Sequence, residues 1–186
     1  TLALPYGTLS WEDHGPREAS VTLVLLHGFP HDRDLWSGQT GSLATSLPDT
    51  RLLVPDLPGL GRSSPLPATS MDRYADAVVA MLDAAQVAEA VIGGLSMGGY
   101  VAFALWRRHP TRVRALVLMD TRAEADTEAA RTKRQELIAS VEAFGVGSMV
   151  DGMLATQVGE TTRREQPALV ERIEVMLRRA PASGVM

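Results

Sequence analysis

The segment from Ala90 to Arg108 constrains the fold of this chain more than any other, because a glycine-rich turn joins two elements of different periodicity there. Residues 90–94 are short and apolar, as expected of a buried strand, and residues 97–108 have helical spacing that ends before Pro110. The segment therefore predicts a strand, a sharp turn and a helix. The turn residues are Gly93, Gly94, Leu95, Ser96, Met97, Gly98 and Gly99.

This turn contains the pattern G-x-S-x-G, and its context predicts that Ser96 is a nucleophile. A serine on such a turn has a strained backbone, and side chains at Gly94 and Gly98 would collide across it. Backbone N–H groups and the dipole of the following helix favour a developing negative charge beside the hydroxyl. The alternative is a glycine-rich turn with an incidental serine. A phosphate loop is excluded because no G-K-[ST] follows.

A second signal follows the apolar run at residues 21–26, which is typical of a strand buried on both faces. A tight turn at Gly28 would aim the N–H of Phe29 toward the carboxyl edge of the sheet. Together with the N–H of Met97 it would form an oxyanion hole. We expect His27 to support this loop by hydrogen bonding rather than to transfer a proton, although His27 and Gly28 could simply end the strand.

Strand and helix patterns alternate up to residue 119, which predicts an α/β fold with a mostly parallel sheet and helices on both faces. After residue 120 only helical patterns follow. We therefore predict an α/β core over residues 1–120 and a helical cap or lid over residues 121–186. The expected strands are 2–4, 8–12, 21–26, 51–54, 90–94 and 113–119, and the expected helices are 35–47, 71–85, 97–108, 127–144, 147–154 and 167–179.

Three segments together resemble the α/β-hydrolase fold superfamily, in particular its small esterases, haloperoxidase-like enzymes and C–C bond hydrolases. They are His-Gly-Phe-Pro at 27–30, Pro-Asp-Leu-Pro-Gly-Leu-Gly-Arg-Ser-Ser at 55–64 and Gly-Gly-Leu-Ser-Met-Gly-Gly-Tyr at 93–100. The resemblance extends to Met119. It implies that Ser96 is the nucleophile, that Phe29 and Met97 supply the oxyanion N–H groups, and that residues 56–64 shape the pocket.

The resemblance also implies an acid and then a histidine later in the chain, yet no histidine follows His109 and no strand pattern follows Met119. The C-terminal strands of the fold are thus missing from this chain, and residues 113–119 would form an apolar edge strand. We expect a second polypeptide to complete the sheet and supply the acid and the histidine. Asp120 stands where some family members carry the acid, but we interpret it as a strand-end or hinge residue.

Composition and charge argue against several other classes of function. The chain has 186 residues, a net charge of −4 and no cysteine, and no run of Lys or Arg stands out. We therefore expect no nucleic-acid binding, no membrane span, no metal site and no cofactor, and a cytoplasmic location.

The leading hypothesis is a serine hydrolase that acts on a small, fairly apolar ester or related acyl compound. One alternative is a lyase, C–C hydrolase or perhydrolase on the same scaffold. A second alternative is a catalytically incomplete fragment that assembles with another chain.

Overall fold

The structure is a computed structural model that describes residues 1–186, and it divides into two compact units. The first unit is Thr1–Ala123 and the second is Glu124–Met186. The sequence placed a boundary at residue 120, where strands give way to helices. That the second unit acts as a cap stays a prediction.

The first unit is built on a five-stranded sheet with the order β3-β5-β4-β6-β7. Its last four strands in that order run parallel to their neighbours, whereas β3 pairs antiparallel with β5. The mostly parallel sheet predicted from the sequence is thereby confirmed. The strands are β3 (Trp11–His14), β4 (Val21–Leu26), β5 (Thr50–Pro55), β6 (Ala90–Leu95) and β7 (Val113–Met119).

The N-terminal region differs from the prediction. In place of one strand over residues 8–12, β2 (Gly7–Leu9) pairs with β1 (Leu2–Leu4), and β3 begins separately at Trp11. The division follows from the partners, because Leu9 pairs with Leu2 whereas Trp11 pairs with Pro55 in the main sheet. A continuous run of extended residues thus contributes to two sheets, which its sequence pattern does not reveal.

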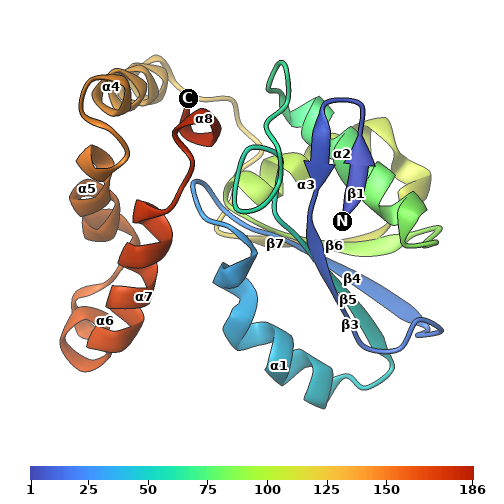
Figure 1. The fold of residues 1–186 in the computed structure, drawn as a ribbon. Coiled ribbons are helices and arrows are strands. Elements are labelled where there is room, and N and C mark those ends of the chain that lie inside the picture. Colours follow the sequence, from blue (N-terminus) through green and yellow to red (C-terminus); the bar gives the residue numbers. More distant parts are fainter. The chain divides into compact units, whose positions relative to one another are not determined.

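Side-chain alternation along the buried strands places one apolar layer on each face of the sheet. On β4, Val24 and Leu26 enter the larger core, while Leu25 belongs to the smaller core with Trp36. Side chains of α2 (Met71–Ala84) and α3 (Met97–Arg108) contribute to the larger core. Side chains of η1 (Arg33–Trp36) and α1 (Ser37–Ser46) contribute to or pack against the smaller one. Figure 1 shows α1 on the opposite side of the sheet from α2 and α3, so helices cover both faces.

Local signals in the sequence set the bounds of these helices. The side chain of Ser70 accepts a hydrogen bond from the N–H of Arg73 at 3.2 Å and caps α2. Helix α3 ends at Arg108, directly before His109 and Pro110, because proline cannot continue a helix.

The second unit consists of helices alone. Thr127 caps α4 through the N–H of Ala130, and Pro167 occupies the first turn of α7. The short helices α6 and α8 were not predicted, because a few residues are too short a window to show helical periodicity. No helix of the chain is long and apolar enough to cross a membrane. The unit contains α4 (Glu128–Phe144), α5 (Gly147–Gln157), α6 (Glu160–Glu165), α7 (Pro167–Arg178) and α8 (Ala182–Val185).

Strand β7 forms one edge of the main sheet, as the sequence predicted. Its pairing partner β6 lies on one side only, and the apolar side chains of Val117 and Leu118 are 46% and 45% exposed. A long apolar edge strand presents unpaired backbone groups to which a further strand can bind.

Candidate active site

Ser96 stands between the end of β6 and the start of α3, where it has φ 50° and ψ −111°. A residue with a Cβ atom rarely adopts this backbone conformation, and such strain is concentrated at functional sites. The Ser96 side chain makes no capping hydrogen bond to α3. Its backbone is held instead, because its N–H donates to the carbonyl of Met119 at 2.9 Å and its carbonyl accepts from Thr121 Oγ1 at 2.8 Å.

The glycines around Ser96 allow this turn to close. A Cβ atom on Gly94 would lie 2.3 Å from the carbonyl oxygen of Gly98, across the turn. A Cβ atom on Gly98 would instead lie 2.3 Å from the carbonyl oxygen of Leu26, at the end of the adjacent strand β4. Both glycines are therefore sterically required. The expected collision across the turn applies to Gly94 alone, whereas Gly98 permits α3 to pack against β4.

The loop after β4 lies directly beside Ser96. A Cβ atom added to Gly28 would lie 3.5 Å from Ser96 Cβ and 3.5 Å from the Leu95 carbonyl oxygen, so the two turns are close neighbours. Phe29 follows in this loop and is partly buried. Met97 opens α3, so its N–H is one of the first-turn donors that have no acceptor within the helix. The fold thus gathers the sequence-predicted residues Gly28, Phe29, Ser96 and Met97 at one end of parallel strands.

His27 uses both ring nitrogens within the protein. Its Nδ1 lies 3.0 Å from the carbonyl oxygen of Gly28, and its Nε2 accepts the N–H of Leu57 at 2.9 Å. This arrangement requires the neutral tautomer with the proton on Nδ1. Burial lowers the pKa of His27 to about 4, because the charged ring would lose its hydration. Both hydrogen bonds suit a residue that supports the loop.

The other histidines within hydrogen-bond reach of acids lie elsewhere. His109 Nε2 contacts Asp76 Oδ1 at 2.8 Å at the far end of α3, and His14 Nε2 contacts Glu12 Oε2 at 3.0 Å. His14 is the last residue of β3, where it pairs with β5. Asp120 follows β7 and is exposed, with a positive φ of 41°. No group of three or more His, Asp or Glu residues could hold a metal ion.

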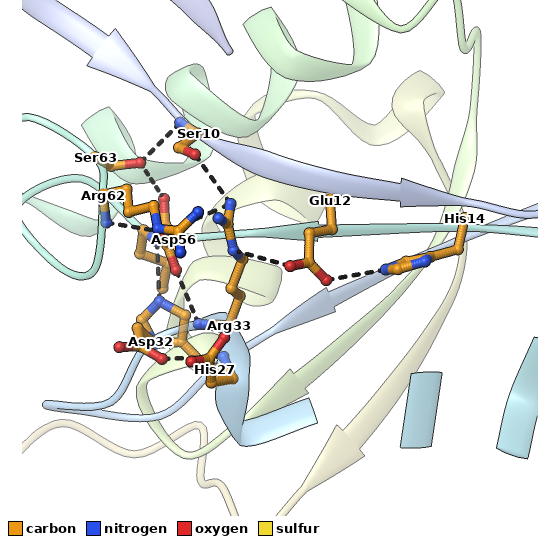
Figure 2. Close-up of polar contacts among 11 residues, drawn as sticks. Ser10, Glu12, His14, His27, Asp32, Arg33, Asp56, Arg62 and Ser63 are labelled. Carbon is orange, nitrogen blue, oxygen red and sulfur yellow. Dashed lines mark hydrogen bonds and ion pairs between the residues drawn. The ribbon is translucent and has the colours of Figure 1, made fainter. Parts of the chain in front are cut away.

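Beside the loop after β4 lies a buried polar network that the sequence analysis did not identify (Figure 2). At its centre, the Asp56 carboxylate accepts the N–H of Arg33 and the N–H of Arg62, each at 2.9 Å. Arg33 Nη1 lies 3.6 Å from Asp56 Oδ2 and donates to Ser10 Oγ at 2.9 Å. The available signal was a charged residue directly after a buried strand, since Asp56 follows β5.

The family described as the alpha/beta hydrolase fold matches residues 21–144, which include both turns and strands β4 to β7. The chain belongs to the α/β hydrolase fold family.

The chain is similar to two curated relatives whose named activities differ, and to a solved esterase structure. The chain is 39% identical over 99 residues to the pimeloyl-[acyl-carrier protein] methyl ester esterase of Aromatoleum aromaticum. The matched residues are 53% of the chain and 36% of that protein. It is 36% identical over 104 residues to the 2-hydroxymuconate semialdehyde hydrolase of a Pseudomonas species, covering 54% of the chain and 36% of the relative.

Among solved structures, a thermophilic esterase from Thermogutta terrifontis superposes with a TM-score of 0.87 at 36% identity. The superposition covers 95% of the chain and 64% of that esterase. The chain thus spans less than two thirds of the length of these relatives, and just over a third of each of the two curated ones.

Proposed function

We propose that the chain supplies the nucleophile and the oxyanion hole of a serine hydrolase that acts on small, fairly apolar esters. The observation that carries this proposal is the backbone of Ser96, which is strained, lies at the N-terminus of α3 and is a close neighbour of the loop that contains Phe29. A hydroxyl held in this way, beside backbone donors and a helix N-terminus, suits attack on an acyl carbon.

In the proposed reaction, Ser96 Oγ loses its proton to a base and bonds to the carbonyl carbon of the ester. The carbonyl oxygen becomes an anion, which accepts hydrogen bonds from the N–H groups of Phe29 and Met97. When the tetrahedral intermediate collapses, the bond to the alcohol breaks and the alcohol leaves with the proton. Water then loses a proton to the base and attacks the acyl carbon. The bond to Ser96 Oγ breaks, the carboxylic acid leaves, and Ser96 regains its proton.

We propose that the base in this scheme lies outside the 186 residues. Of the four histidines, His27 is buried with both nitrogens engaged, His14 and His109 pair with carboxylates at other places in the fold, and His31 is buried in the loop after β4. We propose that a strand from further polypeptide pairs with the exposed edge of β7 and brings an acid and a histidine to Ser96. The exposure of Val117 and Leu118 supports this completion of the sheet.

A fluorophosphonate probe and a series of p-nitrophenyl esters test the proposal on the complete natural protein. Wild-type protein should become labelled on Ser96 and hydrolyse short-chain esters, whereas Ser96→Ala should do neither. Ser42→Ala is the matched control, because Ser42 is exposed on α1 and its hydroxyl donates only to the Gly38 carbonyl. Labelling and hydrolysis that persist in Ser96→Ala would show that another residue is the nucleophile.

An intact-mass measurement under denaturing conditions tests the completion of the sheet. A second polypeptide beside the 20.0 kDa chain, or a single longer chain, should accompany any active preparation. A homogeneous active preparation of the 20.0 kDa chain alone would overturn it.

A C–C bond hydrolase is the second candidate, because one relative at 36% identity is a 2-hydroxymuconate semialdehyde hydrolase. It would use the same Ser96 and oxyanion groups. Cleavage of a dienol diketone, in preference to all esters tested at equal concentration, would favour it.

A further inference from the structure

Two successive residues after β5 bind the two ends of the loop that contains Phe29. At the start of the loop, His27 Nε2 accepts the N–H of Leu57 at 2.9 Å. At its end, the N–H of Arg33 donates to Asp56 Oδ1 at 2.9 Å. Residues 27–33 are therefore attached at both ends to one point of the sheet edge, and the peptide N–H of Phe29 lies between the two attachments.

Asp56 is itself held firmly. Its second carboxylate oxygen accepts the N–H of Arg62 at 2.9 Å, its own N–H donates to the Ser10 carbonyl at 2.9 Å, and its carbonyl accepts from Ser63 Oγ at 2.7 Å. The side chain of Asp56 is only 1% exposed. Such a carboxylate has one orientation available, so it can define the position of the backbone groups that it binds.

The space around the carboxylate is equally restricted. A Cβ atom on Gly61, where φ is +54°, would lie 2.4 Å from Asp56 Cγ. The loop of residues 56–64 therefore closes over the carboxylate only because residue 61 is glycine. Figure 2 shows Asp56 among Ser10, Arg33, Arg62 and Ser63, with His27 below it.

The energetics argue against stability as the purpose of this carboxylate. Burial raises the pKa of Asp56, and the nearby Asp32 adds to the rise, although Arg33 and two backbone N–H groups oppose it. An acid with a raised pKa in the folded state is less favourable when ionised there than in the unfolded chain. Stability therefore falls as the pH rises from the ordinary pKa of an aspartate through the raised pKa of folded Asp56. Because a carboxylate here lowers folding stability, its presence is better explained by the backbone N–H of Arg33 that it holds in place.

We propose that Asp56 is a positioning residue that fixes the end of the loop 27–33 and thereby aims the Phe29 N–H at the oxyanion. This inference rests on the proposed function. It concerns a group that does not touch the substrate, because Asp56 acts on the loop through the N–H of Arg33. A displaced oxyanion donor weakens transition-state binding far more than substrate binding, so the loss belongs in kcat.

Asp56→Asn in the complete natural protein tests this role. Asparagine has one side-chain oxygen, so its NH2 group would face one of the two backbone donors. We expect kcat for ester hydrolysis to fall by about 10- to 100-fold, with KM changed by less than about twofold. The affinity for a trifluoromethyl ketone, which forms a tetrahedral adduct with a serine nucleophile, should fall by a similar factor.

Asp49→Asn is the matched control. Asp49 precedes β5 at the opposite end of the same strand, and its carboxylate also accepts two hydrogen bonds, from the N–H and Oγ of Ser20. The same chemical change there should leave kcat and KM as in the wild type. Gly61→Ala is a second test variant, since it retains the carboxylate but displaces it, and it should lower kcat in the same manner.

Amide hydrogen exchange distinguishes positioning from general stabilisation. In Asp56→Asn, exchange should accelerate in peptides that cover residues 27–33 and stay unchanged in β6 and α3. A kcat within about twofold of wild type, or faster exchange throughout the sheet, would overturn the positioning role. If Ser96→Ala remains active, the proposed function fails first. If Ser96→Ala is inactive and Asp56→Asn is fully active, only the positioning role fails.

Discussion

The strained backbone at Ser96 leads to a prediction that separates stability from activity. With φ 50° and ψ −111°, Ser96 occupies a region that costs a residue with a Cβ atom about 1–3 kcal/mol. Glycine avoids this cost, but it gains conformational entropy in the unfolded chain, which offsets about 0.5–1 kcal/mol. The variant Ser96→Gly should therefore be more stable than Ser96→Ala by about 0.5–2 kcal/mol, while both should be inactive.

The comparison with alanine removes the contribution of the hydroxyl, since both variants lack it. Thermal unfolding should show a Tm for Ser96→Gly that is higher by about 2–4 °C for each kcal/mol, the scaling for a chain of this size. Urea unfolding should show a higher midpoint at an equal m-value.

Ser42, in the middle of α1, supplies the control with the opposite sign. There Ser42→Gly should be less stable than Ser42→Ala by about 1 kcal/mol, because glycine is a poor helix residue. If Ser96→Gly is no more stable than Ser96→Ala, while Ser42 behaves as expected, then the turn is not strained in solution. The physical basis for proposing Ser96 as the nucleophile would then be wrong.

Two further predictions follow from the same turns. Gly94→Ala should destabilise the protein by at least about 1–3 kcal/mol in urea unfolding, because its Cβ would meet the Gly98 carbonyl oxygen at 2.3 Å. Gly41→Ala in α1, where no atom lies within 4 Å of the new Cβ, should instead stabilise by about 0.5–1 kcal/mol, and an equal loss in both would contradict the steric argument. The pKa of His27 is lowered from 6.5 to about 4, so its neutral form stabilises the fold above 6.5 and this contribution is lost as the pH falls toward 4. The unfolding free energy should drop by about 2 kcal/mol more between pH 7 and pH 5 in the wild type than in His27→Gln, and equal slopes would refute the buried neutral imidazole.

The parts of the site that were predicted from the sequence are those determined by neighbouring residues. The strand before Ser96, the helix after it and the glycines between them are contiguous, so their pattern alone predicts the turn. The bounds of α3 and β7 agree with the prediction to the residue, because Pro110 ends the helix and an uninterrupted apolar run forms the strand.

The parts that were not predicted depend on residues distant in the chain. Asp56 and Arg33 are 23 positions apart, and nothing in either segment indicates that a carboxylate of one binds the backbone of the other. The division of the first strands between two sheets has the same origin, since Leu9 and Trp11 take partners in different parts of the chain. The short helices α6 and α8 offered too few residues for a periodic signal.

By itself, then, the sequence determined the α/β class, the turn at Ser96 and the N–H groups beside it, because local sterics and hydrogen bonding dictate these over a few residues. Only the tertiary structure decided why Gly98 must be glycine, that both nitrogens of His27 are engaged, and that residues 56 and 57 hold both ends of the Phe29 loop. The physical reason is that these contacts form between the ends of adjacent parallel strands. Strand order and register set such contacts, and neither can be predicted from the sequence of a single segment.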